Sequence, residues 1–133
     1  MCFYIHKDHS ESKVATEDIV CYKAFVEEDY PVVKDKTKLY SIVQLYPYDQ
    51  NRRYAMPDPI KSDIYKIEIE DNTISKGFHS YATRREHYWN RAIYIECYIP
   101  KGANYYYNPI RKEYVSDELF VTNYDKEVNV NWG

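Results

Sequence analysis

The sequence is poor in glycine and cysteine, the residues that build flexible loops, disulfide frameworks and cysteine-based zinc sites. It contains three glycines and three cysteines among 133 residues. With so few glycines, a glycine-built phosphate cradle is excluded, because such loops place several glycines close together. The cysteines are far apart and lack a Cys-x-x-Cys or Cys/His ligand spacing, so neither a disulfide framework nor a zinc site is encoded. We expect reduced, mostly buried thiols and no bound metal.

Long apolar runs and excess positive charge are also lacking. No apolar run approaches the roughly 18 residues that a membrane helix needs. The first ten residues lack the apolar region of a signal peptide. The formal net charge of −3 argues against a duplex-DNA binder, because phosphate affinity comes mainly from clustered Lys and Arg. We therefore expect a cytoplasmic protein without membrane contact, and duplex DNA is not the expected partner.

Tyrosine and β-branched residues supply most of what the sequence does have. There are 17 tyrosines but only three leucines, whereas Ile and Val together number 22. This composition favours strands over helices, with Tyr rings completing the core. We expect one α+β domain over residues 1–133, with a polar tail from about residue 125. It should be compact and mixed, with a mainly antiparallel sheet and one or two short helices.

Local patterns place the expected elements. Alternation of apolar and polar residues is cleanest at 64–70 and 93–99, and the latter puts four apolar side chains on one face. Residues 83–86 form a capping box (Thr-Arg-Arg-Glu) that predicts a helix over 83–91. The proline-rich stretch 47–59 predicts a long exposed loop. The other expected strands are residues 18–25, 39–46, 104–107 and 118–122, with a loop at 108–112.

Four short motifs follow one another in a recognisable order. They are CYKAF at 21–25, KGFHSYAT at 76–83, IYIECYIPKG at 93–102 and EYVSDELFV at 113–121. This order resembles the ADP-ribosyltransferase superfamily, in particular members with an Arg, Ser-Thr-Ser and Glu-x-Glu signature. The resemblance covers roughly residues 18–121 and implies an ADP-ribosyltransferase-like fold that binds NAD or an ADP-ribose derivative.

The resemblance also implies roles for individual residues. Tyr22 and Lys23 correspond to the Tyr-Arg pair of the early strand, so Lys23 stands where an Arg binds the nicotinamide nucleotide. Lys keeps the charge of Arg but lacks its planar, bidentate fork. The segment that supports the ribose corresponds to His79, Ser80 and Tyr81.

The carboxylate pair of the signature is incomplete. Glu118 stands for the catalytic Glu, and Ser116 stands where the first Glu of the pair would be. The transferase reaction needs a carboxylate that stabilises an oxocarbenium-like transition state, and a second group that engages the acceptor. Glu118 is therefore catalytic only if the protein is a transferase, and the missing partner favours ligand binding over turnover.

Aromatic and arginine residues are interleaved in several stretches, most densely at 84–91. Arg84, Arg85 and Tyr88 share one side of the expected helix. Tyr rings can stack on bases while guanidinium groups hold phosphates, which suits a nucleotide ligand. The alternative is that Tyr serves as the ordinary large hydrophobe of a Leu-poor core, or as part of a protein interface.

A second resemblance rests on several short stretches distributed along the chain. The stretches MCFYI, GFHSY, IPKGANYYY and EYVSDELFV are similar to those of small uncharacterised proteins of bacteriophages and gut bacteria. Together the two resemblances imply a binding module for an NAD- or ADP-ribose-like nucleotide, acting in phage counter-defence by sequestering a host nucleotide signal. An active ADP-ribosyltransferase and a protein-interaction module that inhibits a host defence protein are the alternatives. A homo-oligomer is compatible with each of them.

Overall fold

The structure is a computed structural model that describes residues 3–26, 38–41, 47–56, 69–70, 72–74, 76–83 and 92–122. Within these residues the regular structure consists of strands, and there is no helix. The described part is therefore all-β and sandwich-like, so the expected α+β class is wrong, and with it the ADP-ribosyltransferase-like arrangement. The physical reason is the same excess of β-branched and aromatic side chains that favoured strands in the sequence.

The strands are short except for two long central ones. Their bounds are β1 Phe3–Tyr4, β2 Lys13–Val14, β3 Ile19–Val26, β4 Leu39–Tyr40, β5 Pro47–Tyr48, β6 Arg52–Ala55, β7 Ile69–Glu70, β8 Thr73–Ile74, β9 Phe78–Tyr81, β10 Ala92–Ile99, β11 Asn104–Asn108, β12 Glu113–Ser116 and β13 Glu118–Val121.

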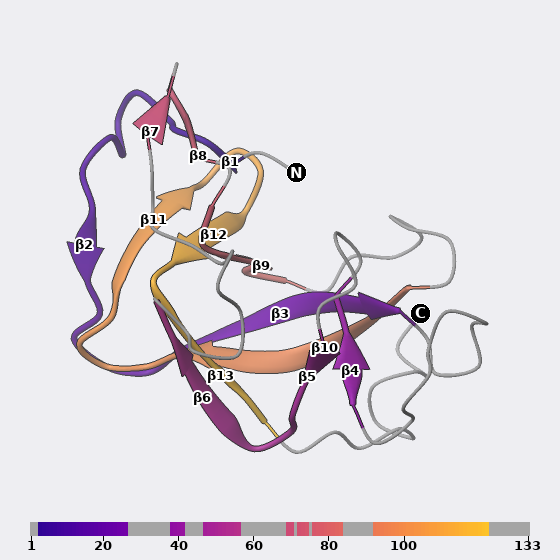
Figure 1. The fold of residues 1–133 in the computed structure, drawn as a ribbon. Helices are drawn as coiled ribbons and strands as arrows, with labels where there is room; N and C mark the ends of the chain where they lie inside the picture. The colour runs from indigo at the N-terminus through magenta and orange to yellow at the C-terminus, as the bar shows by residue number, and fades with distance from the viewer. Residues whose placement is uncertain are drawn as a thin grey trace.

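The main sheet has eight strands in the order β2-β11-β12-β9-β3-β10-β13-β6, and every pairing in it is antiparallel. Its centre is the pair β3 and β10, which run side by side over their full length (Figure 1). A three-stranded sheet (β1-β8-β7) and a two-stranded sheet (β4-β5) accompany it. The order shows that strands far apart in the chain are neighbours in space.

One face of the main sheet, here called the inner face, carries the largest core. Alternate residues of a strand point to opposite faces, and Ile95, Cys97 and Ile99 of β10 all have 0% exposure. They pack with Phe25 of β3 and with Leu119 and Val121 of β13 in one cluster. The β4–β5 sheet covers part of this face, because the Tyr48 ring contacts Phe25 at 5.7 Å between centroids.

Among the described residues, two clusters cover parts of the opposite face, here called the outer face. The three-stranded sheet β1-β8-β7 packs on this face, with Phe3 and Ile74 against Tyr106 and Val115 of the main sheet. Nearer the centre, Tyr81 and Tyr94 pack against Ala24, with Tyr22 at the edge of the cluster. Tyrosine therefore contributes to the core, as the composition indicated.

Several sequence-based expectations about elements are tested by this fold. The strands expected at 18–25, 93–99, 104–107 and 118–122 are confirmed as β3, β10, β11 and β13. The long loop expected at 47–59 is wrong, because its described part contains β5 and β6, whose Tyr48 and Tyr54 rings pack in the core. Of the expected helix only Thr83 is described, and it lies in a bend. Most of the strands expected at 39–46 and 64–70, and the polar tail, lie outside the described residues.

The cysteines behave as buried, unpaired thiols where they are described. Cys21 and Cys97 are both free and fully buried, which confirms that expectation for these two, and Cys2 lies outside the described residues. Among the described residues no helix is long and apolar enough to cross a membrane.

Candidate functional site

Lys23 lies on the inner face of β3, directly opposite Ile95 of β10, and is half-buried. Its Nζ donates a hydrogen bond to the carbonyl oxygen of His79 at 3.2 Å and lies 5.7 Å from the centroid of the Tyr48 ring. Burial lowers the pKa of the Lys23 ammonium below its usual value, opposed by the neighbouring Cys97 and Cys21. The fold therefore brings Lys23 to the His79 segment. There the ammonium donates to a backbone carbonyl oxygen of the same chain.

The groups beside Lys23 are poorly suited to act as nucleophiles. Burial raises the pKa of the Cys21 thiol to about 12, and it raises that of Cys97 as well. Reactive cysteines have lowered pKa values, because the thiolate is the nucleophile. The Ser80 side chain is 1% exposed and also belongs to this buried environment. These residues therefore stabilise the core rather than present a reactive group to solvent.

Tyr22 and Tyr81 lie on the outer face, away from the Lys23 ammonium. They are directly opposed in the pairing of β3 with β9. The Tyr81 ring meets Tyr94 edge-on at 6.0 Å between centroids, within the cluster that includes Tyr22 and Ala24. Both rings therefore have a packing role.

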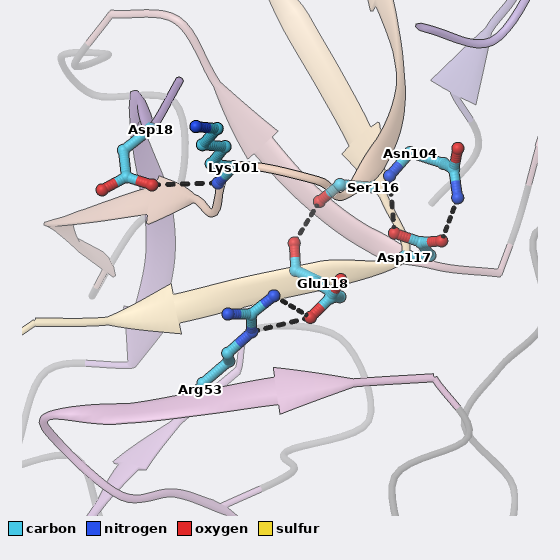
Figure 2. Close-up of polar contacts among 7 residues, drawn as sticks. All are labelled: Asp18, Arg53, Lys101, Asn104, Ser116, Asp117 and Glu118. Atoms are coloured by element: carbon cyan, nitrogen blue, oxygen red, sulfur yellow. Dashed lines mark hydrogen bonds and ion pairs between the residues drawn. The ribbon is translucent and has the colours of Figure 1, made fainter. Parts of the chain in front are cut away.

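Glu118 begins β13 on the outer face and is held by an ion pair. Arg53 Nη2 lies 2.6 Å from its Oε1, and Arg53 Nε donates to the same oxygen at 2.7 Å (Figure 2). Ser116 is fully buried, and its hydroxyl donates to the Glu118 carbonyl oxygen at 2.9 Å. Glu118 and Lys23 thus lie on opposite faces of the sheet.

The candidate residues from the sequence therefore do not form one constellation in the described structure. Lys23 meets the His79 segment, Tyr22 and Tyr81 pack elsewhere, and Glu118 pairs with Arg53. The remaining three candidates, Arg84, Arg85 and Tyr88, lie outside the described residues. No group of three or more potential metal ligands occurs among the described residues.

Two surface features received no role in the sequence analysis. The first is the hairpin tip, defined as residues 109–112 between β11 and β12, which falls within the loop expected at 108–112. Asn108, only 5% exposed, accepts hydrogen bonds at Oδ1 from the backbone N–H groups of Ile110 at 3.0 Å and Arg111 at 3.1 Å. Its Nδ2 donates to the Tyr4 carbonyl oxygen at 2.7 Å. Lys112 adopts a left-handed conformation (φ 53), and its carbonyl oxygen accepts from Ala82 at 2.8 Å.

These contacts fix an apolar side chain at the surface. Ile110 is 76% exposed, the highest fraction among the exposed large hydrophobic residues of the described chain. Beside it the Arg111 guanidinium lies 4.6 Å from the centroid of the Tyr4 ring. The tip therefore displays one aliphatic group next to a stacked Arg–Tyr pair and the Lys112 cation. The Asn-Pro step at 108–109 was the available signal, because Asn initiates turns and Pro favours the next position.

The second feature is the aromatic row, defined as Val20, Tyr98, Phe120 and Arg53. Each is directly opposite the next across β3, β10, β13 and β6 on the outer face. The Tyr98 and Phe120 rings stack with centroids 4.7 Å apart and planes 9° apart. No sequence signal reveals this row, because it depends on the register of four separate strands.

Comparison with known proteins adds no relative. No family model, curated protein or solved structure matches this chain.

Proposed function

We propose that the protein is a protein-interaction module whose hairpin tip docks onto a partner protein. The observation that supports this is the rigid display of Ile110 by the side chain of Asn108. Of the expected nucleotide-binding residues, the described structure brings only Lys23 and the His79 segment together, whereas the hairpin tip presents a preformed apolar anchor.

The energetics of the tip suit docking. Burying an exposed Ile side chain contributes roughly 1.5–3 kcal/mol. Because the turn is already held by Asn108 and Lys112, little conformational freedom is lost on binding. Arginine and tyrosine are enriched among the residues that dominate interface energies, and both flank Ile110 in the stacked pair of Arg111 and Tyr4.

The charge of the tip indicates the chemistry of the partner. Arg111 and Lys112 are exposed, while the adjacent Glu113 is 7% exposed and so lies largely beneath the surface. Complementary potentials steer association and suppress wrong partners. The partner surface should therefore be a small apolar pocket with carboxylates at its rim. The resemblance to phage proteins supports a protein of the host cell as the partner.

The experiment is photo-crosslinking from the tip in the native host cell. A benzophenone amino acid replaces Ile110 in one variant and Val14 in a second, since Val14 is also exposed (58%) but lies on β2. We expect a discrete adduct from position 110 and none from position 14.

A pair of substitutions completes the test. Ile110→Asp should abolish co-purification of the crosslinked partner, and Val14→Asp should leave it unchanged. Equal recovery by both variants, or the same adduct from both crosslinker positions, would show that the tip does not dock.

Nucleotide binding through Lys23, His79 and Ser80 stays a prediction of the sequence. Titration calorimetry of the full chain with NAD and with ADP-ribose measures it directly. Lys23→Met should abolish the heat signal if Lys23 holds the phosphate, whereas Lys13→Met on β2 should not.

A further inference from the structure

The aromatic row is a partly apolar strip on the outer face that the hairpin tip does not involve. Val20 is 54% exposed, the side chain of Arg53 is 52% exposed, and the stacked rings of Tyr98 and Phe120 between them are partly exposed. Aromatic residues and Arg are enriched at interfaces between proteins. The row therefore has the composition of an interface.

The two ends of the row carry charges in a reciprocal arrangement. At the Val20 end, Asp18 Oδ1 accepts the backbone N–H of Lys101 at 2.9 Å, and both residues are exposed. At the Arg53 end, Glu118 pairs with Arg53. Each end thus holds one cation and one carboxylate, Lys101 with Asp18 and Arg53 with Glu118 (Figure 2). The stacked rings of Tyr98 and Phe120 lie between Val20 and Arg53 in the row.

We propose that the aromatic row is the contact surface of a homodimer, in which a second copy of this chain packs face to face about a two-fold axis. An axis parallel to the strands and passing over the aromatic stack reverses the row in the second copy. Tyr98 then faces Phe120 of the other copy, and Arg53 faces the end that holds Val20 and Asp18. The end that holds Lys101 meets Glu118 of the other copy, so both cations lie opposite carboxylates.

Self-complementarity of this kind is what a two-fold interface requires, because the same patch must bind itself. A nucleic acid fits the row poorly, since Glu96, Asp18 and Glu118 would repel phosphates. Both ends of the row carry both signs of charge, so a partner of one sign gains less than a second copy does. The occupant is therefore a second copy rather than a polyanion or a polycation.

Analytical ultracentrifugation of the full chain over a micromolar to millimolar range tests the proposal. We expect the mass to rise from monomer to dimer with concentration. Phe120→Asp should weaken dimerisation by roughly tenfold or more, which is about 1.4 kcal/mol. The matched control is Val14→Asp on β2, also at an exposed residue (58%), which should dimerise like the wild type. A wild-type chain that stays monomeric, or a Phe120→Asp variant that dimerises normally, would overturn the proposal.

A charge-swap experiment tests the orientation of the two copies. Arg53→Asp and Asp18→Arg should each weaken the homodimer, because each places like charges at both contacts. When these two variants are mixed, a heterodimer should form in preference to either homodimer, because it restores opposite charges at one contact and keeps the native pair at the other. Circular dichroism confirms that each variant is folded. Absence of the preferred heterodimer would exclude this two-fold arrangement.

Discussion

The inner and outer faces of β10 differ sharply although they alternate along the same eight residues. On the inner face Ile95, Cys97 and Ile99 are completely buried. On the outer face Tyr94 is buried (1% exposed) in a cluster with Tyr81, whereas Glu96 is exposed and Tyr98 is partly exposed. Apolar burial accounts for the inner residues and for Tyr94, and the stacked pair of Tyr98 and Phe120 supports the pairing of β10 with β13. The difference indicates that the inner face of β10 is core along its length, whereas the outer face is core at Tyr94 and presents side chains to solvent beyond it.

Substitutions at two neighbouring residues of β10, one on each face, should differ most in their effect on the free energy of unfolding. Ile95→Ala should lower the free energy of unfolding by about 2–5 kcal/mol, because it leaves a cavity in a fully buried site. Glu96→Ala, one residue away, should change it by no more than about 0.5 kcal/mol. Urea unfolding followed by Trp fluorescence measures both values. Similar losses from the two variants would contradict the assignment of faces.

Lys23 is a charged residue on the otherwise apolar inner face of β3. Its effect on the free energy of unfolding should therefore depend on pH. Its pKa is lowered in the folded state, so the unfolded chain binds more protons between that lowered pKa and the ordinary value near 10.5. The contribution of Lys23 to stability should therefore be unfavourable at low pH and should improve as pH rises toward 10.5. We expect Lys23→Met to unfold at a higher urea concentration than wild type at pH 7, with the gap narrowing at pH 10. The exposed Lys13→Met variant should show no such trend.

The buried thiols should act in the opposite direction over alkaline pH. Cys21 ionises near pH 9 in the unfolded chain, but burial raises its pKa to about 12 in the fold. The unfolded state loses protons first, so stability should fall as pH rises from 9 toward 12. A Cys21→Ala variant should show a shallower fall between pH 8 and pH 10.5 in the same urea assay. Parallel curves for variant and wild type would show that the pKa of the thiol is the same in the folded and unfolded states.

The smallest effect should come from the ion pair on the outer face. Arg53 is about half exposed and Glu118 about one-fifth exposed in the pair, and exposed pairs contribute only about 0.2–1 kcal/mol. A double-mutant cycle of Arg53→Ala and Glu118→Ala, measured on the monomer at low protein concentration, should give a coupling energy within that range. The coupling should shrink at high salt. A value of several kcal/mol would mean that Glu118 has a larger role than surface pairing.

Local sequence patterns predicted which side chains of β10 lie on the inner face, but they did not predict the order of the strands in the sheet. The apolar alternation at 93–99 predicted β10 and the buried side of it, because a strand has a period of two. The prolines at 47, 57 and 59 suggested a loop, yet Tyr54 of β6 is 3% exposed and packs beside Tyr48 in the core. Tertiary packing here outweighed the local turn signals.

The candidate site was less predictable, for a related reason. Motif order suggested that Lys23, His79 and Glu118 would converge, and the fold does bring the first two together. Glu118, however, shares its side of β13 with Phe120 and therefore faces outward. Which face a residue occupies relative to a distant strand depends on register, and register is not encoded by a short motif. The aromatic row could not be found from the sequence for the same reason.

The pairing of β3 with β10 has a consequence for how the chain reaches its fold. These strands join residues 19–26 to residues 92–99, so the centre of the sheet depends on contacts between distant parts of the chain. Closing such a long loop costs entropy before the core repays it, and proteins dominated by distant pairings fold slowly. β3 therefore gains most of its pairing only when β10 arrives, although it also meets β9 and Ser41. Apolar stretches that are exposed before such distant pairing make a folding chain prone to aggregation.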